Sequence, residues 1–239
     1  MKSQNLISAQ EFNSIPDLHD QPPFPSDPTI FEALGDLFCR HNVLERFGLH
    51  LLHRHYHLPE NCIAFKSEVD GDISLTKIEP ISGLDRNEIR GVLYRLKDDG
   101  CFQPYEFEYG EEVDIPSTFL KELSQTLREY KLERLLALDV TGGRSPTITQ
   151  YEYDYGKTAT ITVNLNRTPI ESEDRQTGLA FVMEGDAPRS YGPNIYAKNV
   201  RDTHNVFYNH NMQIIDDSNF EIDRSAIRGI LVLNGILAY

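Results

Sequence analysis

The sequence contains no tryptophan, only three cysteines and no long apolar run. The small number of cysteines and the lack of an apolar run each exclude a class of protein. Cys39, Cys62 and Cys101 are too few and too widely spaced for a disulfide framework, which favours a reduced, intracellular compartment. No stretch approaches the roughly 20 apolar residues that span a bilayer. The N-terminal residues 1–28 are polar and lack the apolar segment of a secretory signal. We therefore expect a soluble, cytoplasmic protein that does not have the membrane as a partner.

Positive charge is also scarce, because 23 Lys and Arg residues face 37 Asp and Glu residues, for a net charge of −14. Phosphate backbones are bound by concentrated Lys and Arg, so a general nucleic-acid binder is excluded. Two enzyme signatures are missing as well: the Gly-x-Ser-x-Gly elbow of α/β hydrolases and the His-Glu-x-x-His helix of metalloproteases.

The chain length of 239 residues suits one large domain or two small ones, and no composition break or internal repeat marks a second domain. Residues 1–26 contain Pro16, Pro22, Pro23 and Pro25, and are predicted to form an extended N-terminal arm that lies along the body. Residues 27–239 are predicted to form a single domain.

Apolar periodicity predicts both strands and helices. Alternation indicates three hairpins, which join 62–68 with 73–78, 91–96 with 102–109, and 147–154 with 158–165. One helix is expected to begin at Asp27 and Pro28 and to stop near Asn42. A second is expected to be capped by Ser117, and its apolar content continues past Lys131 as far as Leu138. The fold class that follows is α+β, a largely antiparallel sheet covered by two or three helices.

The segment 49–58 contains four of the eight histidines, at positions 50, 53, 55 and 57. As a strand, it would place His53, His55 and His57 on one face, and as a helix it would align His50, His53 and His57. Both interpretations remain open. In the strand, residues two apart lie roughly 6.6 Å apart along the chain, so His53 and His55 could bind one ion.

Neutral imidazole is a common ligand for zinc, copper, iron and nickel, but a catalytic site needs a third ligand and an open position. The remote residues His204 and His210, on one face of a possible strand over 203–211, are the candidates for the missing ligands. Glu106 is the preferred carboxylate near the histidines, as a base or as a partner of a ligand. The competing interpretation places the histidines on a solvated strand face, with the glutamates in solvent and Tyr105, Phe107 and Tyr109 in the core.

The stretch Leu44-Glu45-Arg46-Phe47-Gly48-Leu49-His50-Leu51-Leu52-His53-Arg54-His55-Tyr56, taken with Pro104-Tyr105-Glu106-Phe107, resembles a group of uncharacterised intracellular proteins of filamentous fungi. Those proteins pair a Phe-Gly-x-x-Leu-Leu-His-x-His-Phe stretch with a later Pro-Tyr-Glu-Phe. Their members often carry an acidic residue at the position of His57, so the resemblance points to His53 and His55 as the pair to follow. It implies a fungal cytosolic protein and brings no established reaction.

Two functions follow from these observations. The first is an enzyme acting on a small molecule, with His53, His55 and Glu106 as catalytic residues. A divalent metal such as zinc or iron would be held by His53, His55, His204 or His210, or one histidine would act as a general base without a metal. The second is a non-catalytic binding protein that uses tyrosine-rich sheet faces as its contact surface.

Overall fold

In the part of the chain that can be described, β-strand is the most abundant secondary structure. The computed structural model describes residues 6–25, 27–44, 46–70, 73–140, 148–155, 158–166, 175–191, 194–196, 214–215 and 221–222. The helical segments are α1 (Ala9–Asn13), η1 (Leu18–Asp20), α2 (Pro28–Arg40), η2 (Ile81–Gly83) and α3 (Ser117–Glu129). Twelve of the described strands belong to one sheet, and the short β13 (Ile214–Ile215) and β14 (Glu221–Ile222) pair with each other.

Strand bounds follow the predicted hairpins closely. The twelve strands of the main sheet are β1 (Gly48–Leu51), β2 (Cys62–Asp70), β3 (Ile73–Pro80), β4 (Ile89–Leu96), β5 (Phe102–Tyr109), β6 (Leu136–Asp139), β7 (Ile148–Tyr155), β8 (Ala159–Asn166), β9 (Arg175–Gln176), β10 (Gly178–Glu184), β11 (Ala187–Tyr191) and β12 (Asn194–Tyr196). The predicted pairs β2–β3, β4–β5 and β7–β8 are all antiparallel. Among the described pairings, β2–β5 and β7–β12 run parallel. The expected α+β fold with a largely antiparallel sheet is confirmed.

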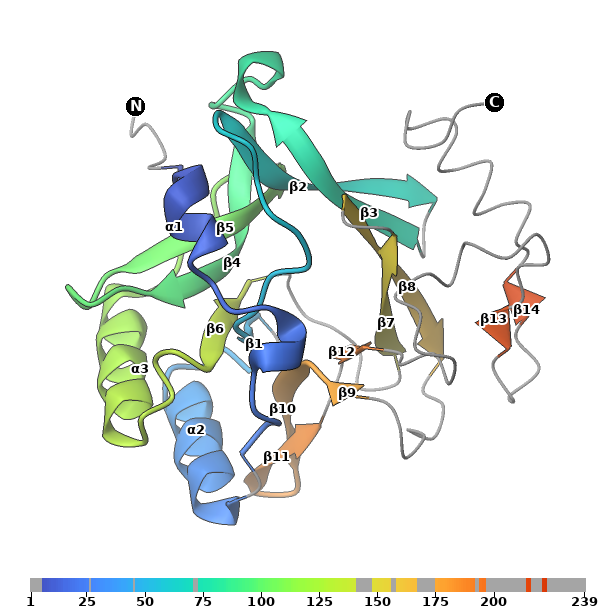
Figure 1. The fold of residues 1–239 in the computed structure, drawn as a ribbon. Coiled ribbons are helices and arrows are strands. Elements are labelled where there is room, and N and C mark those ends of the chain that lie inside the picture. Colours follow the sequence, from blue (N-terminus) through green and yellow to red (C-terminus); the bar gives the residue numbers. More distant parts are fainter. Residues whose placement is uncertain are drawn as a thin grey trace.

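The sheet curls until its distant strands meet across its concave side (Figure 1). Its strand order is β11-β10-β1-β6-β4-β5-β2-β3-β8-β7-β12-β9, so six strands separate β1 from β7. Yet His50 of β1 and Glu152 of β7 lie 3.1 Å apart. The chain from β9 to β10 spans the remaining gap, because β9 pairs with β12 beside β7 while β10 pairs with β1.

Strand alternation divides apolar from polar residues across this curved sheet. On β1 and β6, Leu49, Leu136 and Leu138 face outward and are buried under α2 and α3, while His50 and Asp139 face inward. Phe38 of α2 packs edge-on against Phe119 of α3, with ring centroids 5.1 Å apart. Helices therefore cover the convex face, and the concave face is left for polar side chains.

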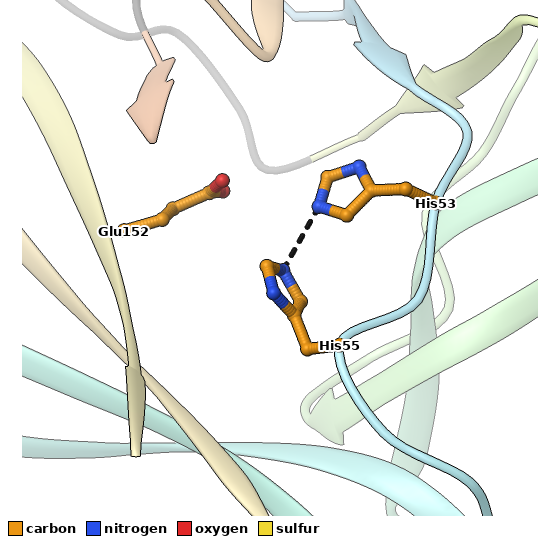
Figure 2. A group of neighbouring side chains, drawn as sticks. All are labelled: His53, His55 and Glu152. Atoms are coloured by element: carbon orange, nitrogen blue, oxygen red, sulfur yellow. Dashed lines mark hydrogen bonds between the residues drawn. The ribbon is translucent and has the colours of Figure 1, made fainter. Parts of the chain in front are cut away.

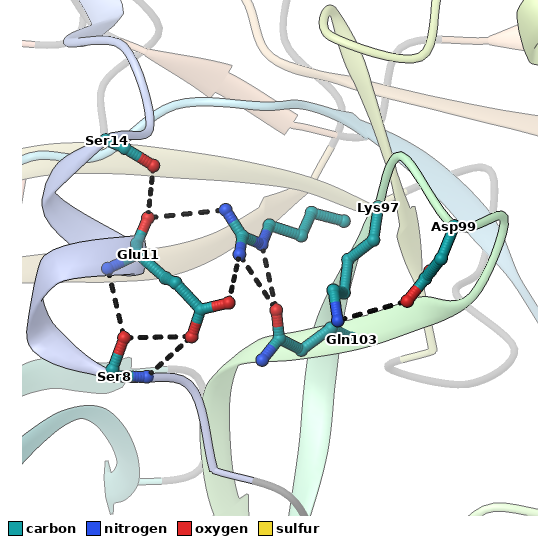
Figure 3. A network of polar contacts seen from close by, with 7 residues as sticks. Ser8, Glu11, Ser14, Lys97, Asp99 and Gln103 are labelled. Atoms are coloured by element: carbon teal, nitrogen blue, oxygen red, sulfur yellow. Dashed lines mark hydrogen bonds and ion pairs between the residues drawn. The ribbon is translucent and has the colours of Figure 1, made fainter.

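Within the N-terminal arm expected over 1–26, residues 6–25 are described, and they lie against the body with two short helical segments, α1 and η1 (Figure 1). Ser8 and Glu11 form a capping box at the start of α1. Glu11 also bonds Arg95 of β4 at 3.2 Å, and Arg95 in turn bonds Gln103 of β5 (Figure 3). Phe12 is buried against Tyr105, which ties α1 to the sheet.

Three details differ from the sequence-based expectations. Pro116, not Ser117, is the N-cap of α3, and no side chain caps this helix. Lys131 has a positive φ of 58°, which ends the helix, so the apolar run beyond it forms strand β6 between β1 and β4. Tyr105 and Phe107 are fully buried as expected, but Tyr109 is 55% exposed because it lies at the end of β5.

Candidate functional site

The histidine segment is a strand only at its start. After β1 ends at Leu51, the Leu51 amide donates to the carbonyl of Thr177 and the Leu52 amide donates to the carbonyl of Leu135 at 2.7 Å. Residues 52–59 then form neither the regular strand nor the helix that the spacing allowed. We call residues 52–58 the histidine loop, and its irregular path brings side chains together that a straight strand would hold further apart.

The N-terminal arm holds the histidine loop at three points. The side chain of Asn13 pairs with both backbone groups of Leu58, accepting from its amide at 2.8 Å and donating to its carbonyl at 2.9 Å. The Arg54 amide donates to the carbonyl of Pro16 at 3.0 Å. The side chain of Gln21 donates to the carbonyl of Leu52. These bonds take the place of the backbone hydrogen bonds that a neighbouring strand would have supplied. They fix the loop that carries His53 and His55.

His53 presents the lone pair of Nε2 toward the interior. Its Nδ1 lies 2.7 Å from the carbonyl oxygen of Leu51, which can only accept, so Nδ1 carries the proton. Burial, together with the nearby His55 and His50, holds the pKa of His53 well below its usual value, so the ring is neutral. A neutral, oriented imidazole is the form that binds metals.

His55 places its own Nε2 only 2.9 Å from the Nε2 of His53 (Figure 2). Two lone pairs repel at this distance, so the pair requires either a proton on His55 or a cation between the nitrogens. Two ligands at right angles and about 2.1 Å from one metal ion would lie roughly 3 Å apart. The spacing of these nitrogens therefore suits a shared proton and a shared metal equally well.

Glu152 on β7 points from the opposite side toward the two rings (Figure 2). Its carboxylate accepts from Nε2 of His50 at 3.1 Å and from the hydroxyl of Thr177 at 2.9 Å. Nδ1 of His50 faces the carbonyl of Leu51 at 3.0 Å, so both nitrogens of His50 face acceptors and both carry protons. His50 and Glu152 form a buried ion pair.

The pKa values of this pair agree with those charges. Burial alone would lower the pKa of His50, but the carboxylate of Glu152 outweighs it and the pKa is raised. Burial alone would raise the pKa of Glu152, but the charge and hydrogen bond of His50 outweigh it and the pKa is strongly lowered. Glu152 is therefore an ionised carboxylate in an interior position, which is costly without cations around it.

Ligand atoms of His53, His55 and Glu152 all lie within 4.8 Å of one another. Two imidazoles and one carboxylate are a common set for a catalytic zinc ion and for non-haem iron(II). This is the only such group of three or more ligands found among the described residues. The cluster has the composition and the spacing to hold a divalent metal ion.

A cavity of about 40 Å³ adjoins the cluster on the concave side of the sheet. Its lining includes His50, His55 and Glu152 at the cluster, and Glu106 of β5 and Asp139 of β6 beside them. Glu106 does not belong to the ligand group, but it faces the same cavity. Burial raises the pKa of Glu106, which makes this carboxyl a better proton carrier near neutral pH than an exposed glutamate.

The structure thus brings together His53 and His55, places Glu106 on the adjoining cavity, and leaves His57 exposed to solvent. His204 and His210 lie outside the described residues. Sequence reasoning missed Glu152, which alternates with tyrosines along β7. The sequence did carry one signal for it. Glu152 and Thr162 are cross-strand partners in the β7–β8 hairpin, so the threonines of β8 and Glu152 together form one polar face of the sheet.

Comparisons with family models, curated proteins and solved structures find no match to this chain, so function is argued from the site alone. Within the described part of the chain, no helix has the length and apolar character needed to cross a membrane.

Proposed function

We propose that this protein is a metal-dependent enzyme acting on a small organic molecule, with His53, His55 and Glu152 as the metal ligands. The observation that supports this most strongly is the convergence of two imidazoles and an ionised carboxylate within 4.8 Å, from segments far apart in the sequence. The carboxylates around the cavity, at positions 106, 139 and 152, also outnumber the cations His50 and Lys66. A proton on His55 or a bound metal ion would balance that charge.

The ligand set favours zinc or iron(II). Softer sites use Cys or Met, whereas magnesium and calcium sites are built from oxygen ligands. Three protein ligands leave coordination positions open, which distinguishes a catalytic site from a closed structural one. When bound, such a metal supplies Lewis-acid polarisation of a substrate oxygen or an activated water molecule.

The surrounding residues support these roles. His50 and Thr177 hold the carboxylate of Glu152 in place, and the carbonyl of Leu51 sets the tautomer of His53. Glu106, on the adjoining cavity, is positioned to take or give a proton. In a metal-free version of the enzyme, the hydrogen-bonded pair His53 and His55 would serve as the base, with Glu106 as its carboxylate partner.

The alternative function, a non-catalytic binding protein with a tyrosine-rich contact surface, has less support from the described residues. Tyr56 and Tyr105 are buried in the core, and among the described side chains Tyr109 is the tyrosine that is largely exposed.

Metal analysis of the purified full chain tests the proposal. We expect about one equivalent of zinc or iron per chain, or stoichiometric uptake of Zn²⁺ or Co²⁺ by protein stripped with a chelator. The double variant His53→Ala, His55→Ala and the single variant Glu152→Gln should weaken metal binding by at least tenfold.

The matched control is His57→Ala, which removes an exposed histidine from the same loop and should leave the affinity unchanged. Circular dichroism establishes that each variant is folded. A chain that binds no transition metal, or variants that bind it as tightly as the native protein, would overturn the metal-dependent proposal. An affinity lost equally in His57→Ala would show non-specific histidine binding and would overturn it too.

A further inference from the structure

Part of the cavity lining is a row of hydrogen-bond donors, called here the donor wall. Lys66 of β2, Thr76 of β3 and Thr160 of β8 are cross-strand neighbours, because Lys66 pairs with Thr76 and Thr76 pairs with Thr160. All three line the cavity. Adjacent strands lie about 4.8 Å apart, so this row of one ammonium and two hydroxyls spans roughly 10 Å.

Thr160 supplies the observation that points to a ligand. The residue is only 4% exposed, and its hydroxyl oxygen has no hydrogen-bond partner in the part of the chain that the structure describes. A buried hydroxyl without a partner costs about 1–3 kcal/mol, so a molecule in the cavity that bonds it is favoured.

The cavity volume limits the size of that molecule. An apolar cavity that admits a benzene ring has a volume of about 150 Å³, so a cavity of about 40 Å³ is limited to a much smaller molecule. A substrate with a long chain or a ring does not fit between the metal ligands and the donor wall. A molecule of three or four non-hydrogen atoms does.

We propose that the cavity binds a small carboxylate or bicarbonate anion as substrate or product, with one oxygen on the metal and the other toward Lys66 and Thr160. This inference rests on the proposed metal site. A metal ion at one end and an ammonium with hydroxyls at the other favour an anion with two separated oxygens. The carboxyl groups of Glu106 and Asp139 also face the cavity. Negative charge on them repels an anion, and the repulsion grows with the charge of that anion. A singly charged ligand is therefore preferred over a dianion such as phosphate.

Cobalt-loaded full-length protein allows a direct test, because the visible absorption of Co²⁺ changes when an anion enters its coordination sphere. Formate, acetate, butyrate and phosphate are titrated in turn. Formate and acetate should change the spectrum saturably, while butyrate and phosphate should bind at least tenfold more weakly. Thr160→Val should raise the dissociation constant for formate about fivefold, and Lys66→Met at least tenfold. Cobalt affinity should stay within twofold of native in both variants.

Thr118→Val is the matched control, since Thr118 is exposed on α3 and should leave formate binding unchanged. Cobalt bound without any response to formate would overturn the anion site and leave the metal site standing. The anion site would also be overturned if butyrate bound as tightly as formate, or if both variants bound formate as tightly as the native protein does. Failure to bind cobalt at all would overturn both proposals. The size series uses the native chain, so it decides the question even where a variant does not fold.

Discussion

At the scale of single residues, the site depends on how Glu152 is held. Its two carboxylate oxygens accept from His50 and Thr177, so it is ionised and oriented before any ligand arrives. Side-chain exposure is 4% for His50 and 9% for Glu152, so water screens this pair weakly. Removing one partner of such a pair leaves a buried, uncompensated charge, which costs much more than removing both.

We therefore expect His50→Leu to lower the free energy of unfolding by about 3–5 kcal/mol, as measured by urea denaturation of metal-free protein. The double variant His50→Leu, Glu152→Leu should recover most of that loss, because no buried charge remains. A double variant as unstable as the sum of the two single variants would show that the two residues do not act as a pair.

The histidines of the site were predictable from the sequence, whereas the carboxylate was not. Two histidines separated by one residue share a face of a strand, so His53 and His55 could be paired from the strand interpretation of the segment alone. Glu152 joins them only because the sheet curls. Alternation along β7 indicates which residues share a face with Glu152, but a single strand does not reveal whether that face is concave or solvated. A curled sheet with a polar interior reverses the usual assignment of polar residues to the outside.

At the scale of elements, the histidine loop depends on the arm that packs beside it. Asn13 bonds both backbone groups of Leu58, and Gln21 bonds Leu52, so the arm holds the two ends of the loop. A loop without a ladder of its own has many conformations, and its ligands are pre-organised only while these bonds persist. The arm thus positions the proposed metal ligands through the backbone of the histidine loop.

Asn13→Ala tests this dependence. The change leaves the amide and carbonyl of buried Leu58 without their partner, which should lower the free energy of unfolding by about 1–3 kcal/mol. It should also weaken Zn²⁺ binding several-fold, as measured by competition with a chromogenic chelator, because His53 and His55 lose their fixed separation.

Asn87→Ala provides the comparison, since Asn87 lies in an exposed turn and its side chain donates a hydrogen bond to the carboxylate of nearby Asp85. It should change neither quantity. A destabilised Asn13→Ala protein with native zinc affinity would limit the arm to a stabilising role.

Helix and strand patterns gave most of the elements, and the errors arose where tertiary structure decides. The helix from Asp27 and the three hairpins carry their own local signals, namely a cap with proline and strict alternation. The run from Leu135 to Leu138 carries none, because four consecutive apolar or small residues fit a buried helix turn as well as a buried strand. Two features of the folded chain make this run a strand. The positive φ of Lys131 ends helix α3 before it, and the run pairs with both β1 and β4 as strand β6.

At the scale of the whole molecule, the proposed metal ligands come from opposite sides of the curled sheet. His53 and His55 follow β1, while Glu152 lies on β7, and six strands lie between β1 and β7 in the sheet order. A bound ion links these two sides directly. Binding to the folded state alone stabilises it by mass action, about 2.7 kcal/mol at a metal concentration of one hundred times the dissociation constant.

For a chain of this size, that energy corresponds to a rise of roughly 5–10 °C in the midpoint of thermal unfolding. We expect this rise when Zn²⁺ is added to metal-free protein in a calorimetric or fluorescence scan. Glu152→Gln should abolish most of the rise, and His57→Ala should keep it. An equal rise in Glu152→Gln would mean that zinc binds without linking the two sides.

The separation of His50 from Glu152 along the chain has a consequence for biosynthesis. Their pair joins residues 102 positions apart, so the carboxylate leaves the ribosome long after the histidines. Until the intervening strands have emerged, a nascent chain presents the imidazoles of His53 and His55 without the carboxylate of Glu152. If the proposed metal site is correct, the nascent chain binds an ion weakly until β7 has joined the sheet, and the choice of metal is made only in the folded protein.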